Sequence, residues 1–317
     1  MALAGLALAL TPSLFAATKT FDATYVATVA GIPPGTKAVT VWLPLPVTRD
    51  AQTVHDVTID SPYAWTRHHD ALYGNDYAVA KIENPPADLA VHVRFVAARN
   101  EITSSHPFDT RASKGDLDRA LAANRLVTLS PRMRKLADEV TAGKRGTVEQ
   151  AHAIYEYVVT SMKYDKSIPG WGNGDSERAC DIKAGNCTDF HSLFMSLARA
   201  KGIPTRFVIG FPVAGLDGDV KGYHCWAEFY IKGRGWIPVD ASDASKLKDA
   251  AAQQYLFGHL DPNRVQFTTG RDLVLHPRTS EPLNYFIYPR AEAEGKLVGE
   301  PKISLQFREV SQTASAE

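Results

Sequence analysis

The chain has 317 residues, 44% of them hydrophobic and 22% charged, so it can bury a sizeable core in one elaborated domain or in two. Thirty-five Lys and Arg balance thirty-five Asp and Glu, and no basic run is interleaved with aromatic residues. This composition does not indicate a polyanionic partner, and we expect no nucleic-acid partner.

The N-terminus predicts export from the cell. Residues 2–10 are all apolar or glycine, and the small residues Ala16 and Ala17 precede the first charge at Lys19. We therefore place a signal peptide at residues 1–17 and expect a periplasmic or secreted protein with no membrane span after cleavage. The basic region that usually opens a signal peptide is missing, so a disordered apolar tail is the alternative.

Residues 18–105 have the pattern of a small antiparallel β domain. Apolar and polar residues alternate from Phe21 to Val29 and again from Leu89 to Ala97, and Pro and Gly clusters separate the runs. Residues 106–129 are polar and rich in alanine, which suits a connector with a short helix.

Three helices are expected next. Ser130 and Pro131 favour the start of the first, and Thr147 with Gln150 predicts a capping box for the second. The third has Asn186 as a candidate N-cap and Asp189 three positions later, and Gly202 ends it. Its apolar stripe contains Phe190, Leu193, Phe194, Leu197 and Ala198.

Strands follow the helices, which indicates an α+β catalytic domain over residues 130–310. We expect a strand at 206–211, a hairpin of 223–231 with 236–240, and a C-terminal β extension with strands near 273–275, 283–288 and 303–307. We expect residues 311–317 to be disordered.

Cys187 stands at the first position of the third helix, where free backbone N–H groups and the helix dipole favour a thiolate. The dipole is worth only about 0.3 to 1 kcal/mol, too little to ionise a thiol with a pKa of about 8.5. A nearby imidazolium is needed, and His224 is the candidate. Asp240 shares the face of His224 if the hairpin loop has an odd residue count or a bulge, and it then orients the imidazole.

These residues lie in ordered blocks that resemble a known family. The blocks are 186–194 (Asn-Cys-Thr-Asp-Phe-His-Ser-Leu-Phe), 198–206, 224–229 (His-Cys-Trp-Ala-Glu-Phe) and 235–240 (Gly-Trp-Ile-Pro-Val-Asp). Over roughly residues 130 to 245 the chain resembles the core of the transglutaminase-like superfamily. The resemblance implies a papain-like fold, with Cys187 as nucleophile, His224 as base and Asp240 as the residue that orients it.

We expect a cysteine-dependent hydrolase of amides or peptides, or an acyltransferase, that works through a thioester acyl-enzyme on a protein or peptide substrate. We prefer hydrolysis, because transfer to an amine requires a site that excludes water. A cross-linking transglutaminase is one alternative. A catalytically inactive binding module of the cell envelope is the other, and the intact set of three residue types argues against it.

Further residues are candidates for supporting roles. The backbone N–H of Cys187 is a natural oxyanion donor, and Trp171 in a glycine-rich loop is a candidate second donor, with an anchoring surface Trp as the alternative. We expect Trp226 to form a wall of the cleft, His191 to pack beneath the site, and Glu228 to tune His224 or to lie exposed on its strand.

We predict no cofactor. A zinc site of Cys180, Cys187, His191 and His224 is not favoured because no CxxC or HExxH motif is present. The sequence also contains no EF-hand loop, so calcium dependence is not expected. A disulfide between Cys180 and Cys225 would leave Cys187 free, but small buried thiols are the favoured interpretation of both.

Overall fold

The structure, a computed structural model, describes residues 17–103 and 112–310. The predicted tail at 311–317 and all of the predicted signal peptide except Ala17 lie outside the described residues, so both remain predictions. Within these two ranges no helix combines the length and the hydropathy that crossing a bilayer requires.

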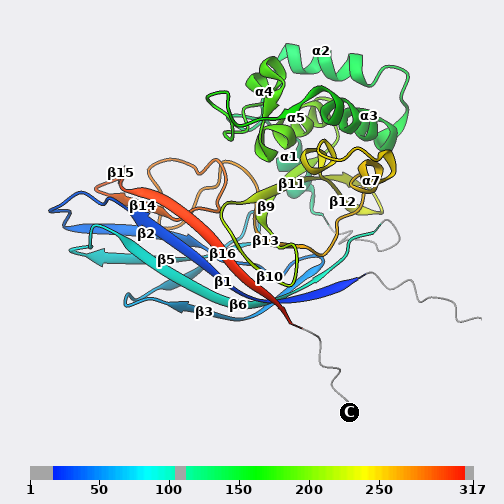
Figure 1. The fold of residues 1–317 in the computed structure, drawn as a ribbon. Helices are drawn as coiled ribbons and strands as arrows, with labels where there is room; N and C mark the ends of the chain where they lie inside the picture. The colour runs from blue at the N-terminus through cyan, green and yellow to red at the C-terminus, as the bar shows by residue number, and fades with distance from the viewer. Residues whose placement is uncertain (1–16, 104–111, 311–317) are drawn as a thin grey trace, which may run out of the picture.

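Two antiparallel five-stranded sheets form the larger β part (Figure 1). In spatial order, the first sheet contains β10 (Asp217–Val220), β16 (Glu300–Val310), β1 (Thr18–Ala30), β6 (Leu89–Asn100) and β3 (Gln52–Asp60). The second contains β15 (Lys296–Leu297), β14 (Arg290–Ala293), β2 (Ala38–Pro44), β5 (Asn75–Glu83) and β4 (Thr66–Asp70). In β1 and β6 the alternation buries one face of the sheet, because successive side chains of a strand point to opposite sides. β2 and β5 are buried on both faces, since Trp42 and Tyr77 pack against Leu283 and Phe286 on the other side.

The C-terminal strands do not follow the predicted course. β16 pairs with β1 along its whole length, and β14 pairs with β2, so both complete the N-terminal sheets instead of extending a C-terminal one. The physical reason is that β1 would otherwise expose a long unpaired edge. Of the predicted strands at 273–275 and 283–288, only an isolated bridge between Leu273 and Leu283 forms.

The helical part surrounds one central helix, α5 (Cys187–Ala200), which packs against α2, α3, α4, β9 and β11. The other helices are α1 (Lys114–Leu121), α2 (Pro131–Val140), α3 (Gly146–Ser161), α4 (Ser176–Ile182), α6 (Ala241–Ala244) and α7 (Ala250–Tyr255). β7 (Lys163–Tyr164) and β8 (Ala184–Gly185) form a short parallel pair.

The predicted starts of two helices have different outcomes. Ser130 caps α2 by accepting from the N–H of Met133, as expected. The capping box predicted for α3 is wrong, because this helix starts one residue earlier and Thr147 lies within its first turn. Glu149 instead accepts from the backbone N–H of Arg145, so a side chain inside the helix satisfies that group.

A four-stranded antiparallel sheet lies against α5. Its spatial order is β12 (Gly235–Val239), β11 (His224–Ile231), β9 (Thr205–Pro212) and β13 (Arg264–Thr269). Helices grouped on one side of an antiparallel sheet confirm the predicted α+β class.

One hydrophobic cluster runs from this sheet into the β part. Tyr25 of β1 contacts the rings of Phe211 and Phe267 on β9 and β13, at centroid distances of 5.8 and 5.1 Å. Its hydroxyl also donates to the backbone carbonyl of Ile287 at 2.8 Å. The β part and the helical part therefore share a continuous core.

Candidate active site

The N-terminus of α5 is built as the sequence predicts. Asn186 is the N-cap, its side chain accepts from the N–H of Thr188 at 2.9 Å, and Asp189 completes a capping box by accepting from the N–H of Asn186. Cys187 is the first helical residue, and its own N–H donates to no acceptor in the part of the chain that the structure describes. This free donor points out of the helix end beside the thiol.

Asp189 also fixes the glycine-rich loop against the helix. Its two carboxylate oxygens accept from the N–H groups of Gly172 and Gly174, at 2.7 and 3.1 Å. These two amides are thus occupied and do not serve as oxyanion donors. Trp171 lies next to them, is 39% exposed, and has Lys166 over its ring at 5.2 Å.

His224 and Asp240 meet on one face of the four-stranded sheet. β11 pairs with β12 so that Ile231 lies opposite Gly235, which leaves a loop of three residues, 232–234. The odd loop length that the sequence argument required is therefore present, and it places both side chains on the same face. Nε2 of His224 donates to Oδ2 of Asp240 at 2.6 Å, which leaves Nδ1 for another partner.

That other partner is the thiol of Cys187, which interacts with the imidazole of His224 by a hydrogen bond and by charge. The structure therefore brings Cys187, His224 and Asp240 together in this order. All three are buried, with exposed fractions of 1%, 6% and 0%.

Asp240 is held by more groups than the sequence revealed. Arg264 of β13 donates to its Oδ2 at 2.8 Å, and the N–H of Asp243 donates to its Oδ1 at 3.1 Å. β13 reaches this position because Gly210 on β9 has no side chain, since a Cβ there would lie 1.9 Å from the carbonyl oxygen of Val265. No local pattern marks Arg264, which follows Asp240 by 24 residues and comes from a different strand.

The environment shifts the pKa values of the thiol and the imidazole in opposite directions. Burial alone would raise the pKa of Cys187, but hydrogen bonds from Cys225 and His224 and the imidazolium charge hold it well below its ordinary value. Burial alone would lower the pKa of His224, but the charges of Asp240 and Asp243 raise it well above its ordinary value. The arrangement therefore favours a thiolate and an imidazolium.

The carboxylate of Asp240 stays charged for a related reason. Burial would raise its pKa, but His224 and then Arg264 outweigh burial and hold the pKa well below its ordinary value. Asp240 thus supplies a permanent negative charge beneath the imidazole.

Two further residues lie at the site, and the sequence did not reveal that the first of them, Cys225, contacts Cys187. Cys225 follows His224 but faces α5, so its thiol lies beside that of Cys187, and burial raises its pKa well above the ordinary value. Cys225 therefore remains a thiol that donates to the neighbouring sulfur. His191 accepts from the N–H of Ala241 at 3.2 Å through Nε2, and burial lowers its pKa, so it is neutral and packs beneath the site as expected.

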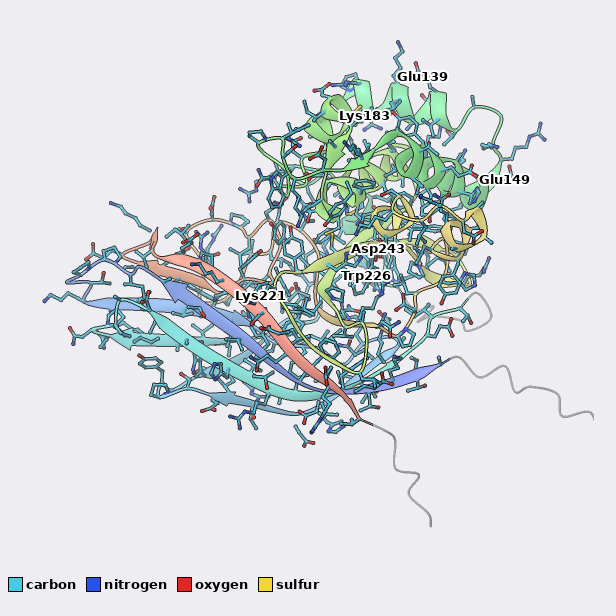
Figure 2. The ribbon with its side chains drawn as sticks, viewed as in Figure 1. Glu139, Glu149, Lys183, Lys221, Trp226 and Asp243 are labelled. Atoms are coloured by element: carbon cyan, nitrogen blue, oxygen red, sulfur yellow. The ribbon has the colours of Figure 1, made fainter. Side chains whose placement is uncertain are left out.

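The predicted roles of Trp226 and Glu228 need correction. Trp226 is fully buried and lies inside the molecule, so its ring forms no wall of a cleft (Figure 2). Glu228 is neither exposed nor beside His224, because it pairs with Arg206 in the interior. Both side chains point to the side of the sheet that the β part covers, which the strand pattern alone does not reveal.

The cysteines and the metal-ligating groups can be placed as well. Cys180, Cys187 and Cys225 are all free thiols, so the alternative disulfide is not formed. Among the described residues, His224, Asp240 and Asp243 could bring ligand atoms within 4.8 Å of one another. A metal ion there would face the guanidinium of Arg264, which donates to the same carboxylate oxygen that His224 uses. This donor set suits an ion pair better than a cation site.

Comparison with known proteins agrees with this geometry. Residues 134–241, which contain all three meeting residues, match the family described as the transglutaminase-like superfamily. This part of the chain is a transglutaminase-like domain.

Similar proteins extend the comparison beyond that domain. An "Uncharacterized protein" of Haemophilus influenzae is 27% identical over 308 residues, with 83% of each chain covered. A "Protein-glutamine gamma-glutamyltransferase" of Pseudomonas aeruginosa is 28% identical over 129 residues, which cover 35% of this chain but only 18% of that protein. The solved structure of a "Putative Cysteine Protease" from Cytophaga hutchinsonii has the same fold, with a TM-score of 0.64, 16% identity, and 95% and 93% of the two chains covered.

Proposed function

We propose that the transglutaminase-like domain is a cysteine-dependent acyl-transfer enzyme with Cys187 as nucleophile, His224 as general acid and base, and Asp240 as the residue that orients it. The observation that carries the proposal is the continuous contact from the thiol at a helix N-terminus, through the imidazole, to a buried carboxylate 2.6 Å from Nε2. Neither a folding role nor a binding role requires this order of groups.

The reaction proceeds through a thioester. The thiolate of Cys187 attacks the carbonyl carbon of an amide, and the developing oxyanion accepts from the free N–H of Cys187. His224 gives its proton to the leaving nitrogen, the C–N bond breaks, and ammonia or an amine departs. Water or an amine then attacks the thioester and gives its proton to His224. The C–S bond breaks, and the thiolate is restored.

We propose Trp171 as a contact for the substrate near the oxyanion. It is exposed beside the glycine loop, and it adjoins the residues that Asp189 ties to the helix end. Its indole N–H is the candidate second donor to the oxyanion.

We propose that water is the principal acyl acceptor and that a protein or peptide is the acyl donor. The alternative, cross-linking through an amine, is supported by the similarity to a protein-glutamine gamma-glutamyltransferase of Pseudomonas aeruginosa. We also propose that the protein acts in the periplasm or outside the cell, on the basis of residues 2–17.

The first test is labelling with iodoacetamide, a reagent small enough for a thiol that is 1% exposed. We expect peptide mapping to find the label on Cys187 in the native protein between pH 6 and 8, and none at this site in Cys187→Ser. The matched control is Cys180→Ser, which removes another buried thiol and should leave the labelling of Cys187 unchanged. No label on native Cys187 in this pH range would contradict the proposal.

The second test identifies the reaction. A peptide library is incubated with the protein, with and without an added primary amine, and the products are analysed by mass spectrometry. Hydrolysis predicts cleaved or deamidated products in both samples, whereas cross-linking predicts amine adducts that need the amine. No product that depends on Cys187 in either sample would contradict both reactions.

A further inference from the structure

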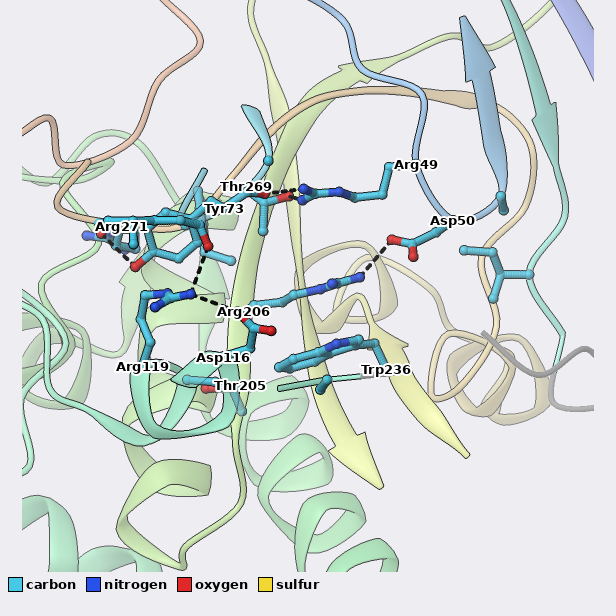
Figure 3. Close-up of a pocket in the computed structure, with 18 of the residues that line it drawn as sticks. Arg49, Asp50, Tyr73, Asp116, Arg119, Thr205, Arg206, Trp236, Thr269 and Arg271 are labelled. Atoms are coloured by element: carbon cyan, nitrogen blue, oxygen red, sulfur yellow. Dashed lines mark hydrogen bonds and ion pairs between the residues drawn. The ribbon is translucent and has the colours of Figure 1, made fainter. Parts of the chain in front are cut away.

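A cavity lies away from the candidate active site. It has a volume of about 900 Å³, within the range of small-molecule sites. Its lining includes Arg49 and Tyr73 of the β part, Arg119 of α1, Arg206 of β9 and Trp236 of β12. Figure 3 shows Arg49, Arg119 and Arg206 entering it from three different segments. Neither Cys187 nor its partners line this cavity.

The register of the four-stranded sheet separates the cavity from His224. Arg206 lies opposite Glu228, which follows His224 by four positions on β11. At a rise of about 3.3 Å per residue this is about 13 Å along the strand. The fully buried Trp226 lies midway between His224 and Glu228 on this strand. The cavity and the thiol are therefore distinct sites.

The lining carries an excess of positive charge. Among the described residues that line it, five are arginines and three are acidic, Asp50, Glu101 and Asp116. Two of the acidic residues are already paired, because Arg206 binds Asp50 at 2.7 Å and Arg119 binds Asp116 at 2.7 Å. Arg49, Arg199 and Arg271 then have no acidic partner at ion-pair distance among the described residues. Arg199 and Arg271 each donate to several hydroxyl, amide or carbonyl oxygens, whereas Arg49 donates to fewer.

Arg49 has no acidic partner within ion-pair distance in the described ranges. Its guanidinium donates to two neutral acceptors, Oγ1 of Thr269 at 2.8 Å and the backbone carbonyl of Tyr73. It is held in place by close packing on Gly74, where a Cβ would collide with the guanidinium. Burial and then the positive charge of Arg206 lower the pKa of Arg49, and the charges of Asp50, Glu228 and Asp70 offset only part of this.

A further buried cation, Arg99, adjoins the lining of the cavity along the chain. Arg99 precedes the lining residue Asn100, is 1% exposed, and has no hydrogen-bond partner for any of its three guanidinium nitrogens within the described chain. Its closest aromatic contact is Trp226, with the ring centroid at 5.9 Å. Unpaired buried cations are costly, so an anion near this group of arginines would lower the free energy of the folded state.

Aromatic side chains adjoin the charged groups. The guanidinium of Arg206 lies over Trp236 with 4.5 Å to the ring centroid, and that of Arg119 lies over Tyr73 at 5.3 Å. Leu72, at the edge of the cavity, is 54% exposed. A ligand with an apolar or planar body would therefore find apolar surface beside the cations.

We propose that this cavity binds a small organic oxyanion, with its carboxylate or phosphate between Arg49 and Arg206 and its ring against Tyr73. Guanidinium groups bind both kinds of oxyanion through paired N–H donors, and the cavity is large enough for an aromatic body. This site is independent of the reaction proposed for Cys187.

Isothermal titration of the whole protein tests the proposal with benzoate, phenyl phosphate and the neutral analogue benzamide. We expect saturable binding of at least one of the two oxyanions, and binding of benzamide at least about tenfold weaker, which corresponds to about 1.4 kcal/mol. If only benzoate binds, the site is specific for a carboxylate, and if only phenyl phosphate binds, it is specific for a phosphate. Binding of both would show a general oxyanion site. No saturation by either oxyanion up to about 10 mM would overturn the proposal.

The variant Arg49→Gln removes the charge and should weaken oxyanion binding by at least about tenfold. The control Arg94→Gln removes a surface arginine that pairs with exposed Asp60, and it should bind as the native protein does. Equal affinity in Arg49→Gln and the native protein would overturn the proposal. If Arg49→Gln fails to fold, amide NMR shifts of the native protein decide: oxyanion-induced shifts at Tyr73 and Thr269 support the site, and their absence overturns it.

Discussion

At the scale of single residues, the charge state of Cys187 depends on neighbours that act in opposite directions. Burial opposes the thiolate, while the imidazolium of His224 and the thiol of Cys225 favour it. Asp240 acts through His224, because it accepts from Nε2 and raises the pKa of the imidazole. The helix dipole adds at most about 1 kcal/mol, so these side chains contribute most of the shift.

The first prediction concerns pH. The thiolate forms as pH rises through the lowered pKa of Cys187, and the imidazolium is lost as pH rises through the raised pKa of His224. We therefore expect a bell-shaped profile of kcat/KM. Its acid limb should lie below the ordinary thiol pKa of about 8.5, and its alkaline limb above the ordinary imidazole pKa of about 6.5. Rates that rise in a single step near pH 8.5 would contradict the ion pair.

The second prediction concerns Cys225. Replacing it with alanine removes a hydrogen bond to the thiolate, so the pKa of Cys187 should rise, by roughly one unit for a bond worth about 1.5 kcal/mol. The measurement is the pH dependence of iodoacetamide labelling at Cys187. Cys180→Ala is the matched control, because this cysteine lies in α4 and is absent from the groups that shift the pKa of Cys187. Identical profiles for Cys225→Ala and the native protein would show that the second thiol is irrelevant.

At the scale of elements, the position of β13 decides whether the guanidinium of Arg264 reaches the carboxylate of Asp240. Arg264 begins this strand, and Gly210 lies opposite Gln266 where the two backbones approach closely. A side chain at position 210 would force the strands apart. The hydrogen bond from Arg264 to Asp240 therefore depends on Gly210, which lies on another strand.

The third prediction is that Gly210→Ala destabilises the protein by about 1 to 3 kcal/mol, because the new methyl group meets backbone that cannot move aside locally. Denaturant titration measures the change in the free energy of unfolding. Gly115→Ala is the control, since this glycine lies inside α1 with space around it and alanine favours a helix. A loss of stability in Gly210→Ala no larger than in the control would contradict the packing argument.

At the scale of the whole molecule, the two ends of the chain meet in one sheet. β1 pairs with β16 so that Tyr25 lies opposite Leu305, and β1 also packs on the four-stranded sheet through Tyr25. β16 and β14 complete the two five-stranded sheets of the β part. We infer that the β part positions the four-stranded sheet and does not act as a separate module.

The fourth prediction follows from the continuous core: the described parts should unfold in a single transition. Circular dichroism, and reactivity of the buried Cys180 thiol with a thiol reagent, should give the same midpoint in denaturant. Tyr25→Ala should shift both midpoints together, at a cost of about 3 to 5 kcal/mol for a large buried ring. Two separate midpoints, or a shift in only one, would contradict a shared core.

Local patterns sufficed for much of this structure. The N-cap at Asn186, the helix after it, the alternation in β1 and β6 and the odd-length hairpin loop all rest on contacts between residues close in sequence. Local pattern placed Cys187 at a helix start and put His224 and Asp240 on one face of a hairpin. The resemblance to the transglutaminase-like superfamily implied that these two segments meet.

The sequence by itself determined the class of fold and the three residues that meet at the site. Only the tertiary structure decided that Arg264 completes the surroundings of Asp240, that Trp226 is buried, and that β16 returns to β1. It also decided where the cavity around Arg49 and Arg206 lies. The physical reason is sequence separation: these features join strands that are far apart along the chain, and their partners are chosen by packing rather than by local propensity.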